Sequence, residues 1–286
     1  MRLNIPTVSV FASGVALGVI LAKHRLRLVG AAARLIASIS SSEQPAAVVH
    51  VVQAADVPVA PVDGKITVVY WDICGLAQPI RLALALAGVE FADVRIDAKN
   101  PGSPEYKQVW FDAKNVVGQS VVFPNLPYIL DGGVGLSQSN TCLRYVGRKY
   151  DLMGPPGCEH LIDFVLDQMA DFDGAITSRC YRDVAALKGW CFDELPWHLR
   201  EWEKLIGGSD FVGGSTCTIA DVKLYETLRK IMRIEADARV RTATLQKHPV
   251  MLAYISRFEA QPRIQAYMAS SAYLASPMNN PHAKLL

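Results

Sequence analysis

The chain is predicted to fold as an α/β domain followed by an all-helical domain. Short β-branched runs and a helix alternate between residues 65 and 137, which is typical of a mixed sheet with covering helices. A cluster of turn-forming residues, Asp151–Gly157, ends this pattern, and helical periodicity dominates after it. With 286 residues, the chain exceeds one average domain. We therefore divide it into an N-terminal extension (1–63), an α/β domain (64–150) and a helical domain (151–286).

The first elements of the α/β domain form one βαβ unit. Ile66–Val69 predicts a strand, and Gln78–Ala87 predicts a helix with Pro79 in its first turn, where a missing N–H costs little. Gly88 is suited to the C-cap of this helix, and Val89–Ile96 alternates as a second strand. A strand, a helix and a strand in such a short stretch predict parallel pairing and a right-handed crossover.

A hairpin and a helix complete this domain. Tyr106–Trp110 predicts a short irregular helix, and two strands flank the glycine turn within Phe123–Leu136. The following helix runs to Tyr150, with Ser139 as its N-cap. The domain is therefore expected to hold a mixed four-stranded sheet in the order βαβ, loop, ββα.

The second domain is predicted to be entirely helical. Thr218 and Asp221 form a capping box that opens one of its helices. Asp171 and Asp173 fall within the first helix, where the residues alone favour a solvated face, and Tyr181 near its end favours packing. The predicted helices span approximately Glu159–Tyr181, Phe192–Ile206, Ile219–Glu235, His248–Glu259 and Pro262–Met268.

Charge and cysteine usage exclude several classes of function. Five of the 29 basic and three of the 27 acidic residues precede Gly64, so the remainder carries equal numbers of both signs. No basic field therefore indicates nucleic acid, and a small-molecule ligand is expected. The six cysteines are scattered, without a C-x-x-C motif or a His/Cys cluster, which disfavours a disulfide framework and a metal site.

The N-terminal extension begins with an apolar segment, Ile5–Ala22, at the lower length limit for a membrane span. Lys23 and several arginines follow it, so the positive-inside rule predicts a membrane anchor with the body of the protein facing the cytosol. The alternatives are a cleaved targeting peptide, which leaves a soluble protein in the cytosol or an organelle, and a secretory signal. Ser38–Gly64 is predicted to be a linker, so folded structure is expected to begin near Lys65.

The most informative stretch is Lys65–Leu84, which predicts a strand, a glycine-containing turn and a helix. Tyr70 ends the strand, and Trp71, Cys74 and Gly75 lie in or next to the turn. Helix N–H groups and the positive end of the helix dipole converge at such a turn, and a tyrosine hydroxyl adds one more donor. The arrangement predicts a site that stabilises an anion.

Several short motifs follow one another along the chain: Y-W-D-I-x-G-L-A, F-P-N-L-P-Y, Q-S-N, the T-x-A-D capping box and S-R-F-E. Together they make residues 65–274 resemble a cytosolic glutathione transferase, most closely of the mu class. The resemblance implies a thioredoxin-like first domain, a helical domain that supplies an apolar electrophile pocket, and a homodimer. It also implies glutathione as co-substrate, no metal, and conjugation of the glutathione thiolate to apolar electrophiles in detoxification.

The resemblance further implies roles for individual residues. Tyr70 would donate a hydrogen bond to the glutathione sulfur, which raises the population of the nucleophilic thiolate. Tyr181 would line the electrophile pocket and assist as an acid, and Asp171 would reach the γ-glutamyl group bound by the partner subunit. Leu126–Pro127 is expected to be a cis peptide. The other glutathione-binding residues implied are Trp71, Leu76, Lys107, Trp110, Lys114, Asn125, Leu126, Pro127, Gln138 and Ser139.

Departures from the mu pattern leave alternatives open. Cys74 and Lys107 stand where mu enzymes carry arginines, and Asn115–Val122 holds an insertion. One alternative is a glutathione-dependent thiol transferase or peroxidase that uses Cys74, because helix N–H groups can stabilise a thiolate there. Another is a non-catalytic glutathione-fold binding protein tethered to a membrane. The non-catalytic protein is disfavoured because the chain retains Tyr70 together with Trp71, Asn125, Gln138 and Ser139.

Overall fold

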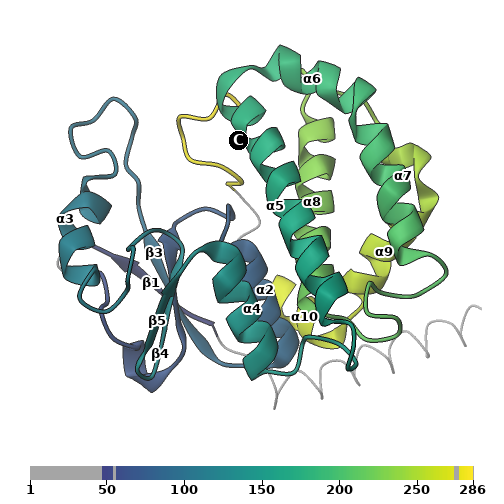
Figure 1. Cartoon of the computed structure of the whole chain (residues 1–286). Coiled ribbons are helices and arrows are strands. Elements are labelled where there is room, and N and C mark those ends of the chain that lie inside the picture. Colours follow the sequence, from purple (N-terminus) through teal and green to yellow (C-terminus); the bar gives the residue numbers. More distant parts are fainter. Residues whose placement is uncertain (1–46, 54–55, 274–276, 286) are drawn as a thin grey trace, which may run out of the picture. The chain divides into compact units, whose positions relative to one another are not determined.

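A mixed five-stranded sheet forms the core of the first domain (Figure 1). Its strands are β1 (Ala47–Val52), β2 (Thr67–Trp71), β3 (Phe91–Ile96), β4 (Tyr128–Asp131) and β5 (Val134–Ser137). The order is β1-β3-β2-β4-β5, with β3 parallel to both β1 and β2, and with β4 antiparallel to both β2 and β5. The predicted βαβ unit and hairpin are therefore confirmed, and they build a thioredoxin-like domain.

The computed structural model describes residues 47–53, 56–273 and 277–285. Within these ranges, no helix combines the length and apolar character that crossing a membrane requires. The apolar segment Ile5–Ala22, on which the predicted anchor depends, lies outside the described residues.

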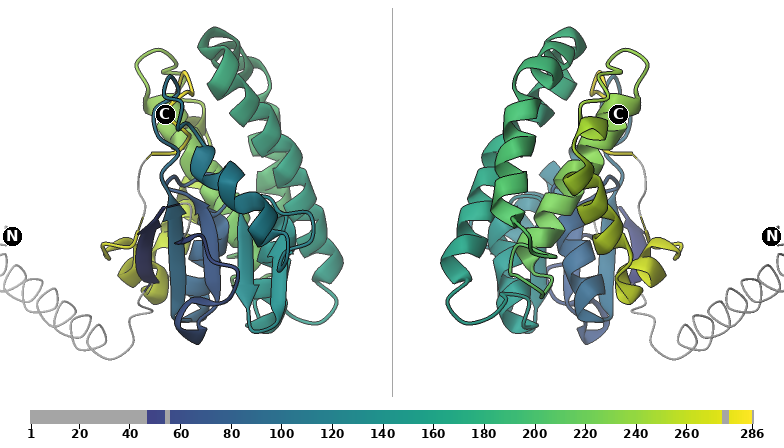
Figure 2. Two further views of the ribbon diagram at one scale, coloured as in Figure 1. Left: turned by 90° about the vertical axis from the view of Figure 1, so that its left-hand side faces the viewer. Right: turned by 90° about the vertical axis from the view of Figure 1, so that its right-hand side faces the viewer.

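Strand β1 comes from the stretch predicted to be a linker, so that prediction is wrong for Ala47–Val52. Its register on β3 runs from Ala47 opposite Phe91 to Val52 opposite Ile96, and Figure 2 shows it at the outer edge of the sheet. The run is β-branched and keeps its more exposed side chains on alternate positions, which suits an edge strand. β1 pairs an edge of β3 that would otherwise stay open. It therefore makes the sheet five-stranded instead of four-stranded.

Helices cover both faces of the sheet. α2 (Gln78–Ala87) and α4 (Ser139–Lys149) lie between the sheet and the helical domain, whereas α3 (Gln108–Val117) lies on the other side (Figure 1). Strands β2 and β3 are buried along their whole length, as expected for a sheet covered on both faces. α2 ends at Gly88, whose φ of 74° suits glycine. The N-cap of α4 is Gln138, so the prediction of Ser139 as N-cap is wrong by one residue, and Ser139 is the first residue of the helix.

The second domain is helical, as predicted, and contains an additional short helix that was not predicted. The additional helix is α6 (Val184–Asp193), and Asp183 caps it by accepting hydrogen bonds from the N–H groups of Ala185 (2.9 Å) and Ala186 (3.1 Å). Its sequence has little amphipathic character, so periodicity does not reveal it. The helices of the domain are α5 (Glu159–Arg182), α6 (Val184–Asp193), α7 (Leu195–Ile206), α8 (Ile219–Ala236), α9 (Pro249–Glu259) and α10 (Pro262–Met268).

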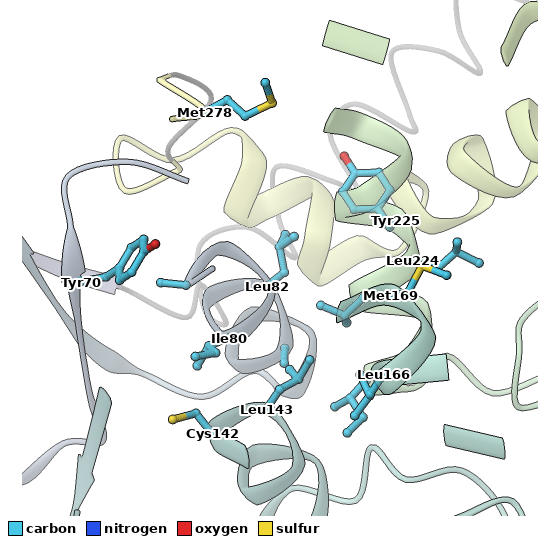
Figure 3. Packing of buried hydrophobic residues seen from close by; sticks show 14 of the residues in the cluster. Tyr70, Ile80, Leu82, Cys142, Leu143, Leu166, Met169, Leu224, Tyr225 and Met278 are labelled. Carbon is cyan, nitrogen blue, oxygen red and sulfur yellow. The ribbon is translucent and has the colours of Figure 1, made fainter. Parts of the chain in front are cut away.

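Apolar side chains join the two domains. Leu82 of α2 and Leu143 of α4 lie on the side of the first domain that faces α5 and α8 (Figure 3). Leu166, Met169 and Leu224 lie opposite them in the same buried cluster. Full burial of such a side chain contributes about 1.5 to 3 kcal/mol, so this packing fixes how the domains meet.

The capping box of α8 is confirmed and has further partners. Thr218 donates to Oδ2 of Asp221 from its N–H (2.8 Å) and from Oγ1 (2.7 Å). Oδ1 of Asp221 accepts from the Val212 N–H and the Tyr254 hydroxyl, both at 2.7 Å. One buried carboxylate therefore holds together the start of α8, the preceding loop and α9.

We expect Asp221→Ala to lower the free energy of unfolding by about 3 kcal/mol or more, because each buried donor left without an acceptor costs about 1 to 3 kcal/mol. Urea denaturation followed by circular dichroism measures the change. Asp193→Ala, at an exposed position of α6, is the control and should change stability by less than about 0.5 kcal/mol. An equally small effect of Asp221→Ala would show that the cap is not structural.

Candidate active site

Tyr70 lies at the end of β2, and its ring packs directly against the turn that follows. A Cβ atom on Gly75 would lie 2.6 Å from Cε1 and 2.8 Å from the hydroxyl oxygen of Tyr70, and Gly75 has a φ of +41°. Any larger residue at this position would therefore displace the ring. Figure 3 shows the hydroxyl of Tyr70 turned away from the sheet. The position of the Tyr70 ring therefore depends on glycine at residue 75.

The Tyr70 hydroxyl is held in its neutral form. Burial raises its pKa, and a hydrogen bond from the backbone of Leu76 opposes this shift only in part. The hydroxyl oxygen therefore accepts one hydrogen bond from the turn and keeps its own proton at neutral pH. That proton is available to an acceptor in the space beyond the turn.

A cavity of about 420 Å³ lies between the two domains, and the side chain of Tyr70 forms part of its wall. Of the residues predicted to form the site, Leu76, Ser139 and Tyr181 line it together with Tyr70. They come from the turn, the start of α4 and the end of α5. The structure therefore brings together the two predicted catalytic tyrosines.

The C-terminal residues 277–285 complete this region and were not predicted to belong to the site. The N–H groups of Cys74 and Gly75 donate to the carbonyls of Pro277 (3.0 Å) and Met278 (3.2 Å). Two backbone hydrogen bonds therefore hold the turn after Tyr70 against this C-terminal segment.

The same segment also positions Tyr181. The Asn280 N–H donates to the Tyr181 hydroxyl at 2.9 Å, and the His282 ring lies 4.6 Å from the Tyr181 ring, centroid to centroid. Burial raises the pKa of Tyr181, with the Asn280 hydrogen bonds acting against it. Tyr181 therefore keeps its proton at neutral pH and can donate it into the cavity.

Three of the residues predicted to bind glutathione lie on or beside α3, away from this cavity. Trp110 is buried, with its ring 6.1 Å from that of Tyr128. Lys107 precedes α3 with a positive φ of 60°, and its ammonium lies 4.8 Å from the centre of the Tyr106 ring. Lys114 is a half-buried residue of α3 itself.

The remaining predicted residues lie in three places. Trp71 is buried next to Tyr70 in β2. The peptide bond Leu126–Pro127 is cis, as predicted, and the Leu126 N–H donates to Oδ1 of Asn125 at 2.9 Å. Gln138 is exposed immediately before α4 and has a positive φ of 69°. Asp171 is exposed on α5 and does not line the cavity.

A charged cluster that was not predicted forms the helical-domain side of the cavity. Asp173 is buried, which corrects its assignment to a solvated face. Its Oδ2 accepts from Lys223 Nζ at 2.6 Å and its Oδ1 from Lys230 Nζ at 3.0 Å. The pocket was expected to be apolar, and this side of it is not. Lys223 and Lys230 are seven residues apart, hence on one face of α8, and that spacing is the only signal the sequence offered.

Opposing effects set the charge state of the cluster. Burial alone would raise the pKa of Asp173, but Lys223 and Lys230 outweigh it and hold the pKa at about 2. Burial would likewise lower the pKa of Lys230, and Asp173 reverses this so that the pKa is raised. The carboxylate and the Lys230 ammonium are both ionised at neutral pH.

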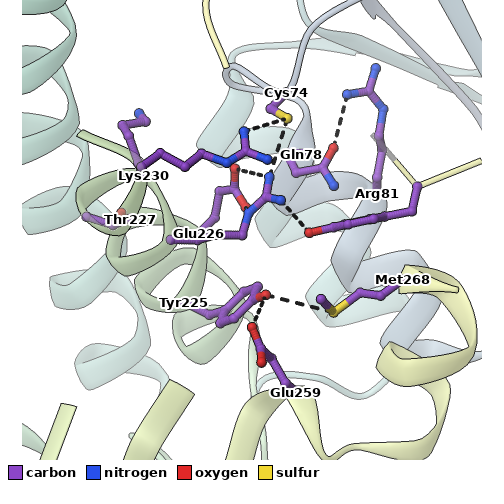
Figure 4. Close-up of polar contacts among 12 residues, drawn as sticks. Cys74, Gln78, Arg81, Tyr225, Glu226, Thr227, Lys230, Glu259 and Met268 are labelled. Atoms are coloured by element: carbon purple, nitrogen blue, oxygen red, sulfur yellow. Dashed lines mark hydrogen bonds and ion pairs between the residues drawn. The ribbon is translucent and has the colours of Figure 1, made fainter. Parts of the chain in front are cut away.

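Cys74 lies behind the turn, not in the cavity. Its side chain is fully buried, and its Sγ accepts hydrogen bonds from Arg229 (3.3 Å) and Arg233 (3.8 Å) (Figure 4). Burial and the nearby Glu226 raise the pKa of the thiol, and the two arginines act against this. Cys74 does not line the cavity that holds Tyr70. Its position gives no support to a thiol transferase or peroxidase mechanism.

We expect Asp173→Asn to lower the free energy of unfolding by about 3 to 5 kcal/mol at pH 7, because it leaves two buried ammonium groups without their counter-ion. A carboxylate with a depressed pKa stabilises the fold above its unfolded pKa, and this contribution is lost as pH falls toward about 2. The difference between parent and variant should therefore narrow between about pH 5 and pH 3.

Urea titrations at about pH 5 and pH 3 measure the difference in the free energy of unfolding between parent and variant. Asp171→Asn, on the exposed side of α5, is the matched control. A difference that is constant with pH would mean that Asp173 is not the ionised partner of the lysines.

Comparisons with known proteins agree with this architecture. The family model described as "Glutathione S-transferase, N-terminal domain" matches residues 66–148, and "Glutathione S-transferase, C-terminal domain" matches residues 170–271. The chain is 32% identical over 218 residues to human "Glutathione S-transferase Mu 3", which covers 75% of this chain and 92% of that protein. It is 36% identical over 217 residues to "Glutathione S-transferase" from Tyrophagus putrescentiae, covering 75% and 94%.

A solved structure shares the fold. "Structure of Onchocerca Volvulus Pi-class Glutathione S-transferase" matches with a TM-score of 0.63 at 24% identity, covering 77% of this chain and 99% of that one. The matching family models, the similarity to Mu-class relatives and this fold lead to one conclusion. The chain belongs to the glutathione S-transferase family.

Proposed function

We propose that this glutathione transferase adds the glutathione thiolate to an electrophilic carbon and that the Tyr70 hydroxyl stabilises the thiolate. Membership of the family supports glutathione conjugation. The observation that carries the role of Tyr70 is its geometry: a neutral phenol near the end of β2 that packs against Gly75 and lines a cavity between the domains.

The chemistry follows from the charge of the thiol. An unperturbed thiol has a pKa of about 8.5 and is mostly protonated at neutral pH, whereas the thiolate is the nucleophile. A hydrogen bond from Tyr70 to the sulfur favours the thiolate and lowers the thiol pKa. The sulfur electron pair then forms a C–S bond, and the displaced halide departs or an opened epoxide oxygen takes a proton. Tyr181 is the proposed donor of that proton.

The remainder of the glutathione site is assigned by the family resemblance. Ser139 lies at the N-terminus of α4, where N–H groups suit the γ-glutamyl carboxylate, and Gln138 precedes it. Leu126 would pair its backbone with the cysteinyl residue, which requires the Asn125 side chain to release the Leu126 N–H. The proposed partners of the glycine carboxylate are Lys107, Trp110 and Lys114, with Trp71 and Leu76 beside the tripeptide.

We expect Tyr70→Phe to slow conjugation of an aryl halide at pH 6.5 by about 100-fold or more, the scale for removing one preorganised donor from a developing anion. The loss should shrink as pH rises, because the thiol then ionises without help. Stopped-flow or steady-state assays with saturating glutathione measure this.

Tyr150→Phe, at the end of α4 and outside the cavity, is the control and should keep the parent rate. Parent activity in Tyr70→Phe at pH 6.5 would remove Tyr70 from the mechanism.

A two-fold symmetric dimer explains two apolar features of the surface. Phe123 is 83% exposed and Val122 is 75% exposed, which is unusual for neighbouring large apolar side chains. A separate cavity of about 390 Å³ between α5 and α7 is lined by Phe164, Trp197 and Trp202, among others. In a two-fold dimer, the Phe123 side chain of each subunit can enter the cavity of the other. The exposed side chain and the cavity are then buried in both subunits.

The proposed dimer would bring Asp171 close to the partner subunit. Asp171 lies seven residues after Phe164 on α5, so both residues are on one face of the helix. With Phe164 in the interface, Asp171 would face the glutathione site of the partner subunit, which is its proposed role.

We expect Phe123→Asp to raise the dimer dissociation constant by about 30-fold or more, as for loss of a buried aromatic anchor worth about 2 kcal/mol. Sedimentation velocity at micromolar concentrations measures the monomer fraction. Val250→Asp, at an exposed apolar residue of α9, is the control and should leave the assembly unchanged. Equal dimer populations for both variants would show that Phe123 is not an anchor.

The cellular location stays a prediction from the sequence. A cytosol-facing membrane anchor at Ile5–Ala22 and a soluble protein left by a cleaved targeting peptide both concern residues outside those that the structure describes.

A further inference from the structure

The electrophile side of the cavity carries an excess positive charge. Lys223 and Lys230 share the single carboxylate of Asp173, so this cluster holds one more positive than negative charge. The neighbouring Glu226 does not balance it, because Arg229 already engages both of its oxygens at 2.9 and 3.0 Å. Taken together, these five side chains retain one formal positive charge.

The hydrogen bonds of the cluster leave more donors than acceptors available. Each lysine ammonium has three N–H groups and uses one of them on Asp173. Both oxygens of Asp173 are occupied, and Oδ1 also accepts a longer bond of 3.4 Å from Thr227. The cluster can therefore bind an anion but offers little to a cation.

Because the two lysines are buried, their excess positive charge favours binding of an anion. The side chains of Lys223 and Lys230 are only 3% and 6% exposed, yet both line the cavity. An ion that is removed from water without a full counter-charge is costly, and a ligand that supplies the missing negative charge recovers part of that cost. Charge-assisted hydrogen bonds to a carboxylate are also stronger than neutral ones.

The cluster lies within reach of a small substrate that also meets Tyr70. One cavity is lined by Tyr70 on the side of the first domain and by Lys223 and Lys230 on the side of α8. A single aromatic ring can therefore present a reactive carbon to the sulfur at Tyr70 and an acidic substituent to the lysines.

We propose that the second substrate is an electrophile that carries a carboxylate, which Lys223 and Lys230 bind while its reactive carbon faces Tyr70. This inference rests on the proposed conjugating function and narrows its substrate class from apolar to anionic electrophiles. The sulfur forms the C–S bond and the leaving group departs as before, while the carboxylate stays unchanged.

A matched pair of substrates tests the proposal with the full chain. 4-Chloro-3,5-dinitrobenzoate and 4-chloro-3,5-dinitrobenzamide share the reactive carbon and the leaving group and differ in charge. After division by the uncatalysed rates, kcat/KM of the parent should favour the benzoate by about tenfold or more, the scale of a hydrogen bond to a charged group. Because the two lysines share this effect, Lys223→Met and Lys230→Met should each reduce the preference by about threefold or more.

The variants keep a neutral buried pair, because Asp173 retains one lysine in each case. Lys188→Met, at an exposed position of α6, is the control and should keep the parent preference. Inhibition by non-reacting 3,5-dinitrobenzoate, compared with 3,5-dinitrobenzamide, gives a second readout and should weaken in the same two variants.

The outcomes distinguish a failure of the anion site from a failure of the conjugating function. No preference for the benzoate in the parent, or the same preference in the parent and both lysine variants, overturns the inference. A raised KM for glutathione with an unchanged preference also overturns it, because the lysines would then serve the other substrate. Failure of the conjugating function would instead appear as no reaction with 1-chloro-2,4-dinitrobenzene, and binding of 3,5-dinitrobenzoate measured by calorimetry then tests the anion site alone.

Discussion

A buried ionic network around Asp93 holds the turn on which the site depends. Arg81 of α2 donates to Oδ1 of Asp93 at 2.8 Å, and both side chains are completely buried. Arg81 also donates to the carbonyl of Ile73 at 3.0 Å, and this hydrogen bond ties α2 to the turn that contains Gly75. Arg95 of β3 lies 2.7 Å from the other oxygen of Asp93. Removing one partner of such a network leaves an uncompensated buried charge, so the position of the turn is tightly specified.

The site in front of this turn is arranged to hold negative charge. Tyr70 and Tyr181 are neutral donors because burial raises the pKa of both hydroxyls, and Lys223 and Lys230 supply a positive charge on the α8 side of the cavity. A thiolate and a carboxylate on the second substrate would repel each other in an apolar pocket, where charges are poorly screened. The excess charge beside Asp173 reduces that repulsion. The donors and the lysines are therefore complementary parts of one electrostatic arrangement.

The sequence predicted those features whose physical cause is local. Gly75 next to Tyr70, the cap of Thr218 with Asp221, and Gly88 at the end of α2 each depend on residues a few positions apart. The family resemblance then supplied Tyr181, more than one hundred positions away, which the residues alone would have assigned to packing. The cis peptide at Leu126–Pro127 likewise came from the resemblance.

The missed features depend on contacts distant in sequence. Asp173 pairs with lysines 50 and 57 residues away, and nothing near it in the chain distinguishes it from the exposed Asp171. The segment from Pro277 onward is joined to the Tyr70 turn through backbone groups, which carry no sequence signal. Ala47–Val52 becomes a strand because β3 offers an unpaired edge, a property of the folded sheet and not of the run itself.

The most direct test of the account is the pKa of the glutathione thiol when it is bound to the protein. The absorbance of the thiolate at about 240 nm can be followed against pH for the binary complex and for glutathione in buffer. If the Tyr70 hydroxyl donates to the sulfur, the bound thiol must ionise well below the unperturbed value of about 8.5. A bound thiol that titrates at the same pH as glutathione in buffer would contradict the central claim.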